Sequence, residues 1–150
     1  MKRSALMSAV VLPLLLAATP LLAAEYGTAD EARAMLERAV AAVNADEPKA
    51  LAEFSKGQAG FKDRDLYVFC AGPDGKIDAH PNPALMGNDM NTIKDKNGKL
   101  FGQEMVRVAQ AGTLNEVSYM WPRLGTTEPV PKVAYVTKVK DQVCGVGYYK

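Results

Sequence analysis

The sequence predicts a single α+β domain, in which helices pack against a five-stranded antiparallel sheet. Two patterns predict this class. An apolar stripe with spacings of three and four residues is typical of one long helix near the N-terminus, and five short segments of strand composition follow it. Tight turns between such short strands favour antiparallel pairing. The chain has 150 residues and is 48% hydrophobic, which is typical of a globular protein rather than a disordered one.

The first helix is expected to begin at a capping box, Thr28-Ala-Asp-Glu31, in which hydroxyl and carboxylate satisfy free backbone N–H groups. Its apolar positions run from Ala32 to Val43 and share one face. A second, shorter helix is expected from Pro48, a residue that the first helical turn tolerates, and Gly57 ends it.

The strands are expected from residue 66 onward. Residues 66–70 and 76–80 form a predicted hairpin around the turn Pro73-Asp-Gly75. A connection rich in Pro, Asn and Gly then leads to a helix over 100–111. Three strands follow, over residues 116–121, 132–140 and 142–149. Alternation places Val117, Tyr119 and Trp121 on one face of the first, and Val133, Tyr135, Thr137 and Val139 on one face of the second.

Residues 1–24 have the features of a secretory signal peptide. Lys2 and Arg3 precede an apolar stretch over 5–18, and small residues stand at 23–24. An uncleaved membrane anchor is the alternative, although prolines interrupt the segment. We therefore expect one mature domain over 25–150 in the periplasm, without stable membrane insertion. Its net charge is −1, against +1 for the whole chain.

Few residues could support catalysis, metal binding or nucleic-acid binding. His80 is the only histidine, no nucleophile-elbow motif surrounds the serines of the mature chain, and no glycine-rich phosphate loop is present. We expect no enzyme activity and no cofactor, with a small exported hydrolase using His80 as the alternative. The calcium-loop pattern at 93–104 has Ile93 where an oxygen ligand is needed, so no metal site is expected. The near-neutral charge argues against nucleic acid as a partner.

Two features remain that could support a function. Cys70 and Cys144 lie on the first and last predicted strands, and in an oxidising compartment such a pair more often forms a disulfide than a metal site. Two buried free thiols are the alternative. The second feature is a set of aromatic residues with one histidine and one lysine: Tyr67, Phe69, His80, Tyr119, Trp121, Lys132 and Tyr135. Such residues could bind an anionic small molecule, or they could simply pack the sheet.

Several motifs occur in a characteristic order between Glu31 and Lys150. They are Tyr67-Val-Phe69, Asp74-Gly75-Lys76, His80-Pro81-Asn-Pro83, Leu85-Met-Gly87, Asp95-Lys-Asn-Gly98, Val117-Ser-Tyr119-Met-Trp121-Pro122, Pro131-Lys132 with Tyr135-Val136, and Gly145-Val-Gly147-Tyr148-Tyr149. This ordered set resembles the single Cache domain, type 2, of bacterial extracellular sensors.

The resemblance implies a PAS-like fold, with a long N-terminal helix on one face of a five-stranded antiparallel sheet and a small-ligand pocket on the other. In that fold the first and last strands are neighbours, which favours a disulfide between Cys70 and Cys144. The resemblance also assigns roles to the seven candidate residues. Tyr67 and Phe69 would line the floor, Tyr119 and Trp121 a wall, Lys132 and Tyr135 would hold an anionic group, and His80 would either edge the pocket or fix its loop.

Members of this family bind small organic carboxylates or related metabolites and pass occupancy to attached kinase or chemotaxis modules. Because Lys150 directly follows the last predicted strand, the sequence favours a free-standing periplasmic binding module that would need a separate membrane kinase or chemoreceptor. A structural or interaction protein with a vestigial pocket is the alternative.

Overall fold

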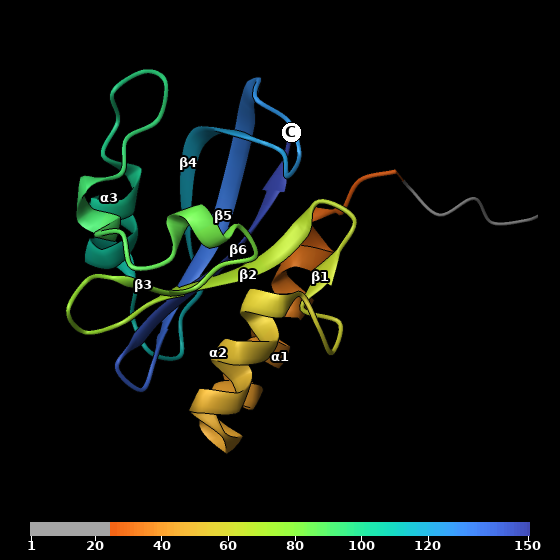
Figure 1. Cartoon of the computed structure of the whole chain (residues 1–150), viewed down its shortest axis with the longest axis vertical. Helices are drawn as coiled ribbons and strands as arrows, with labels where there is room; N and C mark the ends of the chain where they lie inside the picture. The colour runs from red at the N-terminus through yellow and green to blue at the C-terminus, as the bar shows by residue number, and fades with distance from the viewer. Residues whose placement is uncertain (1–24) are drawn as a thin grey trace, which may run out of the picture.

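A computed structural model describes residues 25–150 of the chain (Figure 1). The predicted signal peptide lies outside these residues. Within the described part, no helix combines the length and the apolar character that crossing a membrane requires.

The two N-terminal helices form as the sequence predicts. Helix α1 (Ala29–Ala45) is capped at Thr28, whose hydroxyl accepts from the Glu31 amide at 3.2 Å while the Glu31 carboxylate accepts from the Thr28 amide at 2.8 Å. Helix α2 (Glu47–Lys56) ends at Gly57, which adopts the left-handed conformation (φ 63°).

The remaining elements form the sheet and the segments that cover its second face. The strands are β1 (Lys62–Asp63), β2 (Leu66–Ala71), β3 (Ile77–Ala79), β4 (Asn115–Pro122), β5 (Pro129–Val139) and β6 (Gln142–Tyr149). All pairings are antiparallel, the order is β1-β2-β6-β5-β4, and β3 also pairs with β2. Two 3₁₀ helices, η1 (Pro83–Leu85) and η2 (Met90–Thr92), and helix α3 (Phe101–Val108) lie between β3 and β4.

The five predicted strands are present, and the fold is of the α+β class. The short strand β1 was not predicted. Helix α3 ends at Val108, three residues before the predicted end. Two contacts outside the helix account for this early end. The Asn115 side chain donates to the Val108 carbonyl at 2.7 Å, and Ala111 forms a bridge to Lys138 of β5.

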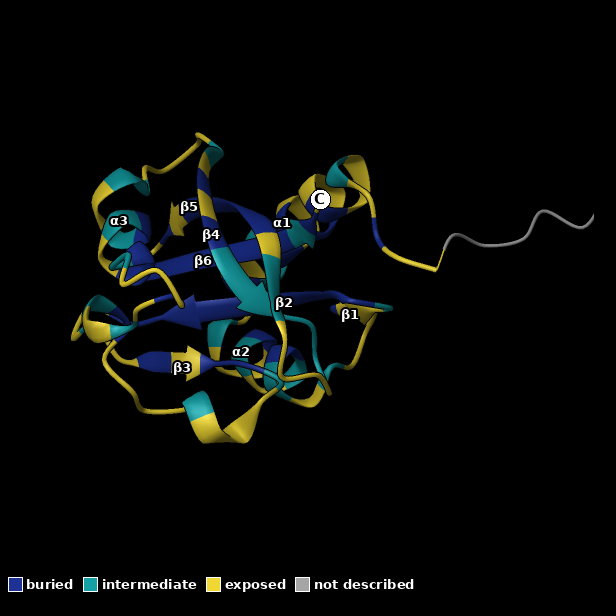
Figure 2. Cartoon of the chain, turned by 90° about the horizontal axis from the view of Figure 1, so that it is seen from above, coloured by how far each residue is buried: buried dark blue, intermediate teal, exposed yellow. Residues whose placement is uncertain are grey.

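The sheet separates two apolar clusters. In β2, Leu66, Val68 and Cys70 point toward α1 and α2, whereas Tyr67 and Phe69 point toward the opposite face. Helices α1 and α2 cover the first face and α3 with η2 covers the second (Figure 1), and the central strands are buried between them (Figure 2). Strands β2, β5 and β6 are therefore buried on both faces over most of their length, whereas the edge strands β1 and β4 are partly exposed.

Cys70 and Cys144 form a disulfide, with an S–S distance of 2.05 Å. The two residues are direct partners in the β2–β6 register, and both are fully buried under the helices. The predicted disulfide is confirmed. It can form because β2 and β6 are neighbours in the sheet.

Candidate functional site

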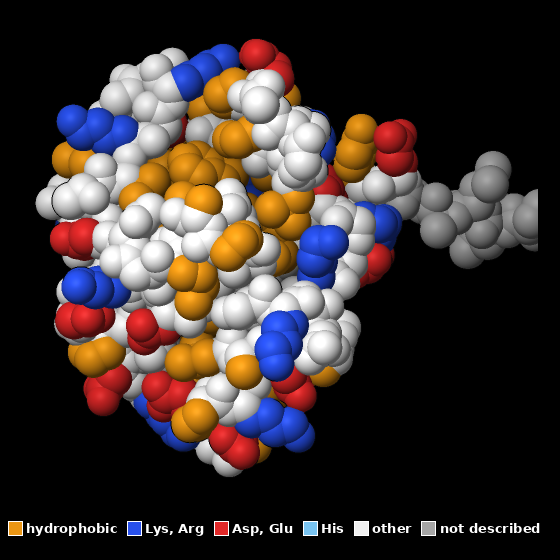
Figure 3. All heavy atoms as spheres, viewed as in Figure 1, with side chains coloured by type: hydrophobic (Ala, Val, Ile, Leu, Met, Phe, Trp, Pro, Cys, Tyr) orange, Lys and Arg blue, Asp and Glu red, His pale blue; other side chains and the backbone are white. Residues whose placement is uncertain are grey.

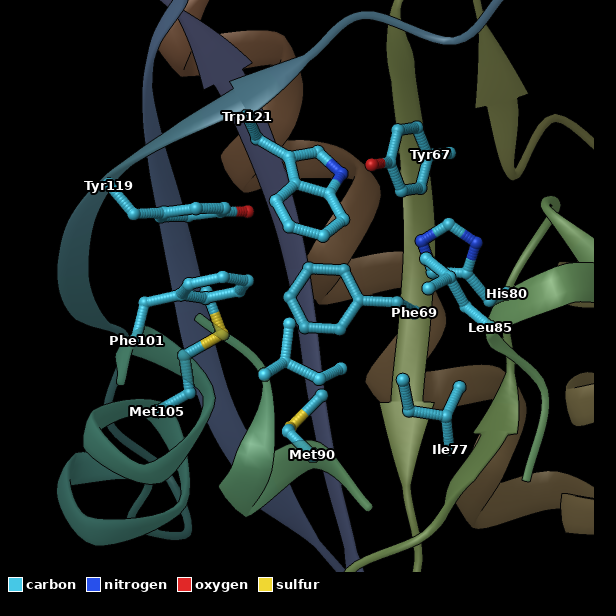
Figure 4. A pocket seen from close by; sticks show the side chains of 11 residues that line it. Tyr67, Phe69, Ile77, His80, Leu85, Met90, Phe101, Met105, Tyr119 and Trp121 are labelled. Carbon is cyan, nitrogen blue, oxygen red and sulfur yellow. The ribbon is translucent and has the colours of Figure 1, made fainter. Parts of the chain in front are cut away.

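An aromatic pocket lies on the sheet face opposite α1 and α2 (Figure 4). The pocket is partly open to solvent, and its volume is about 30 Å³. Its lining comes from three strands, the connection that follows β3, and α3: Tyr67, Phe69, Ile77, His80, Leu85, Met90, Ile93, Phe101, Met105, Tyr119 and Trp121. In the space-filling view, apolar side chains line a hollow beside α3, and charged side chains lie mostly at the periphery (Figure 3).

Small residues in the middle of the sheet make room for this pocket. On β6, Gly145 and Gly147 lie between the aromatic residues of β2 and the pocket-facing residues of β5, where Gly145 pairs with Val136 and Gly147 with Ala134. A Cβ added at Gly145 would lie 2.5 Å from Cζ of Phe69, and one added at Gly147 would meet Cε of Lys132. The glycines therefore allow Phe69 and Lys132 to lie flat across the sheet floor.

The far wall is a group of stacked rings. Phe101 of α3 stacks on Tyr119 of β4 with a centroid distance of 4.2 Å, and it meets Trp121 edge-on at 5.1 Å. Both β4 residues point inward because they alternate with outward residues along the strand. Trp121 lies beside Tyr67 at one end of the pocket (Figure 4).

Lys132 of β5 is a charged residue built into this floor, and its side chain is 1% exposed. Its Nζ donates to the Tyr67 hydroxyl at 2.8 Å and lies over the rings of Tyr67 and Tyr149, at 4.1 and 4.6 Å from their centroids. Within residues 25–150, no carboxylate lies within ion-pair distance of this Nζ. Burial lowers the pKa of Lys132 to about 7, opposed by the Asp65 carboxylate and assisted by the Arg123 charge.

His80 lies at the pocket edge, with its ring 5.0 Å from that of Tyr67. Its Nδ1 accepts from the Asn82 amide at 2.9 Å, so the neutral ring carries its proton on Nε2. Burial lowers the pKa of His80 to about 4, and the Lys132 charge adds to this effect. The same side chain thus edges the pocket and fixes the loop, and it is neutral at neutral pH.

The depressed pKa of His80 predicts a loss of stability in acid. The folded protein binds the His80 proton near pH 4 and the unfolded chain near pH 6.5, so the unfolded state holds more protons between these values. The free energy of unfolding should therefore fall as the pH drops from 6.5 to 4, with up to about 3 kcal/mol from this residue. Urea denaturation at several pH values measures it.

His80→Asn is the matched control, because the Asn side chain can still accept from the Asn82 amide but does not titrate. The carboxylates of the protein titrate equally in the wild type and in the variant. The difference between wild type and variant should therefore shrink as the pH falls; parallel curves would contradict this prediction.

Six of the seven predicted site residues cluster on one face: Tyr67, Phe69, His80, Tyr119 and Trp121 line the pocket, and Lys132 contacts it through Tyr67. Tyr135 does not join them. It lies on the helix-covered face, where its ring meets Tyr148 at 5.7 Å and the Arg33 guanidinium at 4.7 Å. Because side chains alternate along β5, Lys132 and Tyr135 must point to opposite faces.

The sequence reasoning missed Tyr149 of β6. Its ring lies beneath Lys132, and its hydroxyl donates to the Pro122 carbonyl at 2.8 Å. Its spacing from Gly145 and Gly147 places all three on one face of β6, so alternation could have identified it.

A family model described as Cache domain matches residues 32–149. The chain belongs to the Cache domain family. The match spans one domain of type 2, as the sequence resemblance implies. His80 lines the pocket, whereas Ser55 and Ser118, the two serines of the predicted mature domain, do not line it.

The Cache domain shares sequence with a chemoreceptor. It is 34% identical over 90 residues to the methyl-accepting chemotaxis protein McpP of Pseudomonas putida, covering 58% of this chain. The match covers only 16% of that receptor's length.

Solved structures of sensor domains share the fold. The periplasmic sensor domain of a chemotaxis protein is 32% identical, with a TM-score of 0.62 over 80% of this chain and 88% of the other. A Cache chemosensory domain described in terms of carboxylic acid recognition is 28% identical, with a TM-score of 0.60 over 77% and 84% of the two chains. A methyl-accepting chemotaxis protein of Vibrio parahaemolyticus, 22% identical with a TM-score of 0.65 over 80% and 86%, shares the fold. This chain is a Cache sensor domain homologous to the periplasmic sensor domain of a chemotaxis protein.

Proposed function

We propose that this Cache domain binds a small organic carboxylate in the periplasm and reports its occupancy to a membrane chemoreceptor or kinase. The observation that carries the proposal is Lys132, a buried ammonium beside an aromatic pocket with no carboxylate within ion-pair distance in the described chain. A buried charge is costly unless it is paired, and a ligand carboxylate would supply the pair.

Two neutral donors would complete the anion site. The Tyr67 hydroxyl already contacts Lys132, and Nε2–H of His80 is free of the Asn82 contact, which uses Nδ1. The apolar part of the ligand would lie against Phe69 and Trp121. The Cache chemosensory domain described for carboxylic acid recognition supports this ligand class.

The size of the pocket sets a condition on binding. A space of about 30 Å³ holds one or two water molecules, so a carboxylate must push side chains apart. Met90 and Met105 of the lining are unbranched and adaptable, and Leu85 lies on the short helix η1 near the surface. We propose that these side chains yield on binding.

A thermal-shift screen tests the proposal. The mature protein is heated with carboxylates of two to six carbons, with amino acids and with amines. Binding to the native state raises the melting temperature, so one or more carboxylates should raise it and amines should not. Trp121 is the only tryptophan of the sequence and lines the pocket, so its fluorescence gives a direct second readout.

The alternative function is an interaction protein with a vestigial pocket, and the small volume of the pocket favours this alternative. If no compound changes either the melting temperature or the Trp121 fluorescence, the vestigial pocket is the correct interpretation.

A further inference from the structure

A stack of alternating aromatic and cationic side chains runs from the pocket floor to the segment before α1. Its members, in spatial order, are Tyr67, Lys132, Tyr149, Arg123 and Tyr26. Nζ of Lys132 lies over Tyr67 and Tyr149, and the Arg123 guanidinium lies 4.6 Å from the ring centroid of Tyr149 and 4.2 Å from that of Tyr26. Each contact is within the range of a cation–π interaction.

Asp65 fastens the outer end of this stack. One oxygen of its buried carboxylate pairs with Nε of Arg123 at 3.2 Å, and the other accepts from the Gly27 amide at 2.8 Å. The Asp65 carboxylate thus contacts both Arg123 and the N-terminal segment 25–27, and Nη1 of Arg64 also holds this segment by donating to the Tyr26 carbonyl at 3.0 Å. Tyr26 itself remains 44% exposed, so its contact with Arg123 lies at the surface and can open without disturbing the core.

The charges in the stack make its two ends interdependent. Lys132 and Arg123 both contact Tyr149. Burial is the main cause that lowers the pKa of Lys132; the Asp65 carboxylate raises this pKa, and the Arg123 charge lowers it further. When Tyr26 covers Arg123, water screens this guanidinium less, and its interaction with charges nearby is stronger. An anion bound at Lys132 would be attracted by both Lys132 and Arg123, and this attraction would oppose the repulsion between the two cations and the repulsion between the anion and the Asp65 carboxylate.

We propose that residues 25–27 form a latch on the anion site, such that docking of Tyr26 on Arg123 and binding of a carboxylate at Lys132 favour each other. The inference rests on the proposed function. It adds Arg123 and Tyr26 as positioning residues for the ligand, and it makes the segment that enters α1 responsive to occupancy. Coupling of this kind is reciprocal, so either end reports on the other.

The test uses acetate as the probe and the mature protein throughout. Acetate affinity is measured by Trp121 fluorescence, and hydrogen–deuterium exchange at the Gly27 amide reports docking of the latch. In the wild type, acetate should slow exchange at Gly27. Arg123→Gln and Tyr26→Ala should each weaken acetate binding about fivefold and remove the effect of acetate on Gly27 exchange.

Arg33→Gln is the matched control. Arg33 makes the same kind of contact with a tyrosine, Tyr135, but on the helix-covered face. This variant should bind acetate as the wild type does. If Arg123→Gln fails to fold, the Tyr26→Ala variant decides the matter, since it alters only a half-exposed ring.

The outcomes separate the two proposals. If the wild type binds acetate but both variants bind it equally well, or if acetate leaves Gly27 exchange unchanged, the latch is refuted and the carboxylate site stands. If the wild type binds neither acetate nor any other carboxylate of the screen, the proposed function and the latch fail together.

Discussion

Lys132→Met should weaken carboxylate binding by at least about 30-fold without reducing the stability of the fold. Removing one partner of a buried, hydrogen-bonded charge pair costs about 2 kcal/mol or more, and about 2 kcal/mol corresponds to about 30-fold in affinity. Met has a length similar to that of the Lys stem and fills the same space. Affinity follows from titration of the carboxylate that raises the melting temperature most, with Trp121 fluorescence as the signal.

The stability side of this prediction follows from the buried charge. At pH 6 the folded protein holds Lys132 as an ammonium in an apolar environment, which is unfavourable. Met removes that cost but leaves the Tyr67 hydroxyl without its donor, a loss of about 1–3 kcal/mol. We expect these effects to offset one another, so the free energy of unfolding in urea at pH 6 should not fall below that of the wild type.

Lys140→Met is the matched control. Lys140 is partly exposed in the turn between β5 and β6 and pairs with Glu47 at 3.9 Å, and it lines neither the aromatic pocket nor the surface beside Lys132. The same substitution there should leave carboxylate affinity unchanged. Equal losses in the two variants would show that the effect of Lys132→Met is not specific to the proposed anion site.

The pH dependence of binding checks the same assignment. Because the pKa of Lys132 in the free protein is about 7, its ammonium is mostly protonated at pH 6 and mostly neutral at pH 8. Carboxylate affinity should therefore fall about tenfold from pH 6 to pH 8. His80, with a pKa of about 4, stays neutral across this range and does not contribute. An affinity that is constant over this range would contradict the role of Lys132.

The sequence could predict the parts of this fold that depend on local patterns. The capping box before α1, the turn at Pro73-Asp-Gly75 and the alternation in β4 depend on neighbouring residues, and the structure has all three. The end of α3 depends on distant contacts. Residues 109–111 are not helical, and Ala111 forms a bridge to Lys138 of β5. No local sequence pattern predicts that contact.

The residues of the candidate site also divide into those that local patterns predict and those that depend on distant contacts. Alternation alone places Tyr119 and Trp121 together, and it also separates Tyr135 from Lys132, although the family resemblance grouped those two. Strand geometry, rather than the order of motifs, predicts correctly which of these side chains share a face. The stack through Arg123 and Tyr26 could not be predicted, since it forms only when both ends of the domain meet beside Asp65.

Removal of the disulfide should destabilise the fold more than any single substitution in the pocket or the latch. The bridge joins residues 74 positions apart, and the loop-entropy model gives a closure of that length about 4 kcal/mol of stabilisation through the unfolded state. Cys70→Ala combined with Cys144→Ala should lower the free energy of unfolding by that order. Urea denaturation measures it, and the slope against urea should rise because the unfolded variant is less compact.

Reductant provides the control. A reducing agent should bring the wild type close to the stability of the double variant and should leave the variant itself unchanged. Thiol titration of the denatured, unreduced wild type should find no free thiols; two thiols per chain would disprove the bridge.

The folded double variant should nevertheless keep its pocket. The bridge and the pocket lie on opposite faces of the β2–β6 pair, and the register that sets Phe69 beside Gly145 is fixed by backbone pairing as well as by the bridge. Carboxylate affinity, measured below the melting temperature of the variant, should therefore stay within about twofold of the wild type if the disulfide acts chiefly on the unfolded chain. A large loss of affinity would instead mean that the bridge holds the aromatic floor in place in the native state.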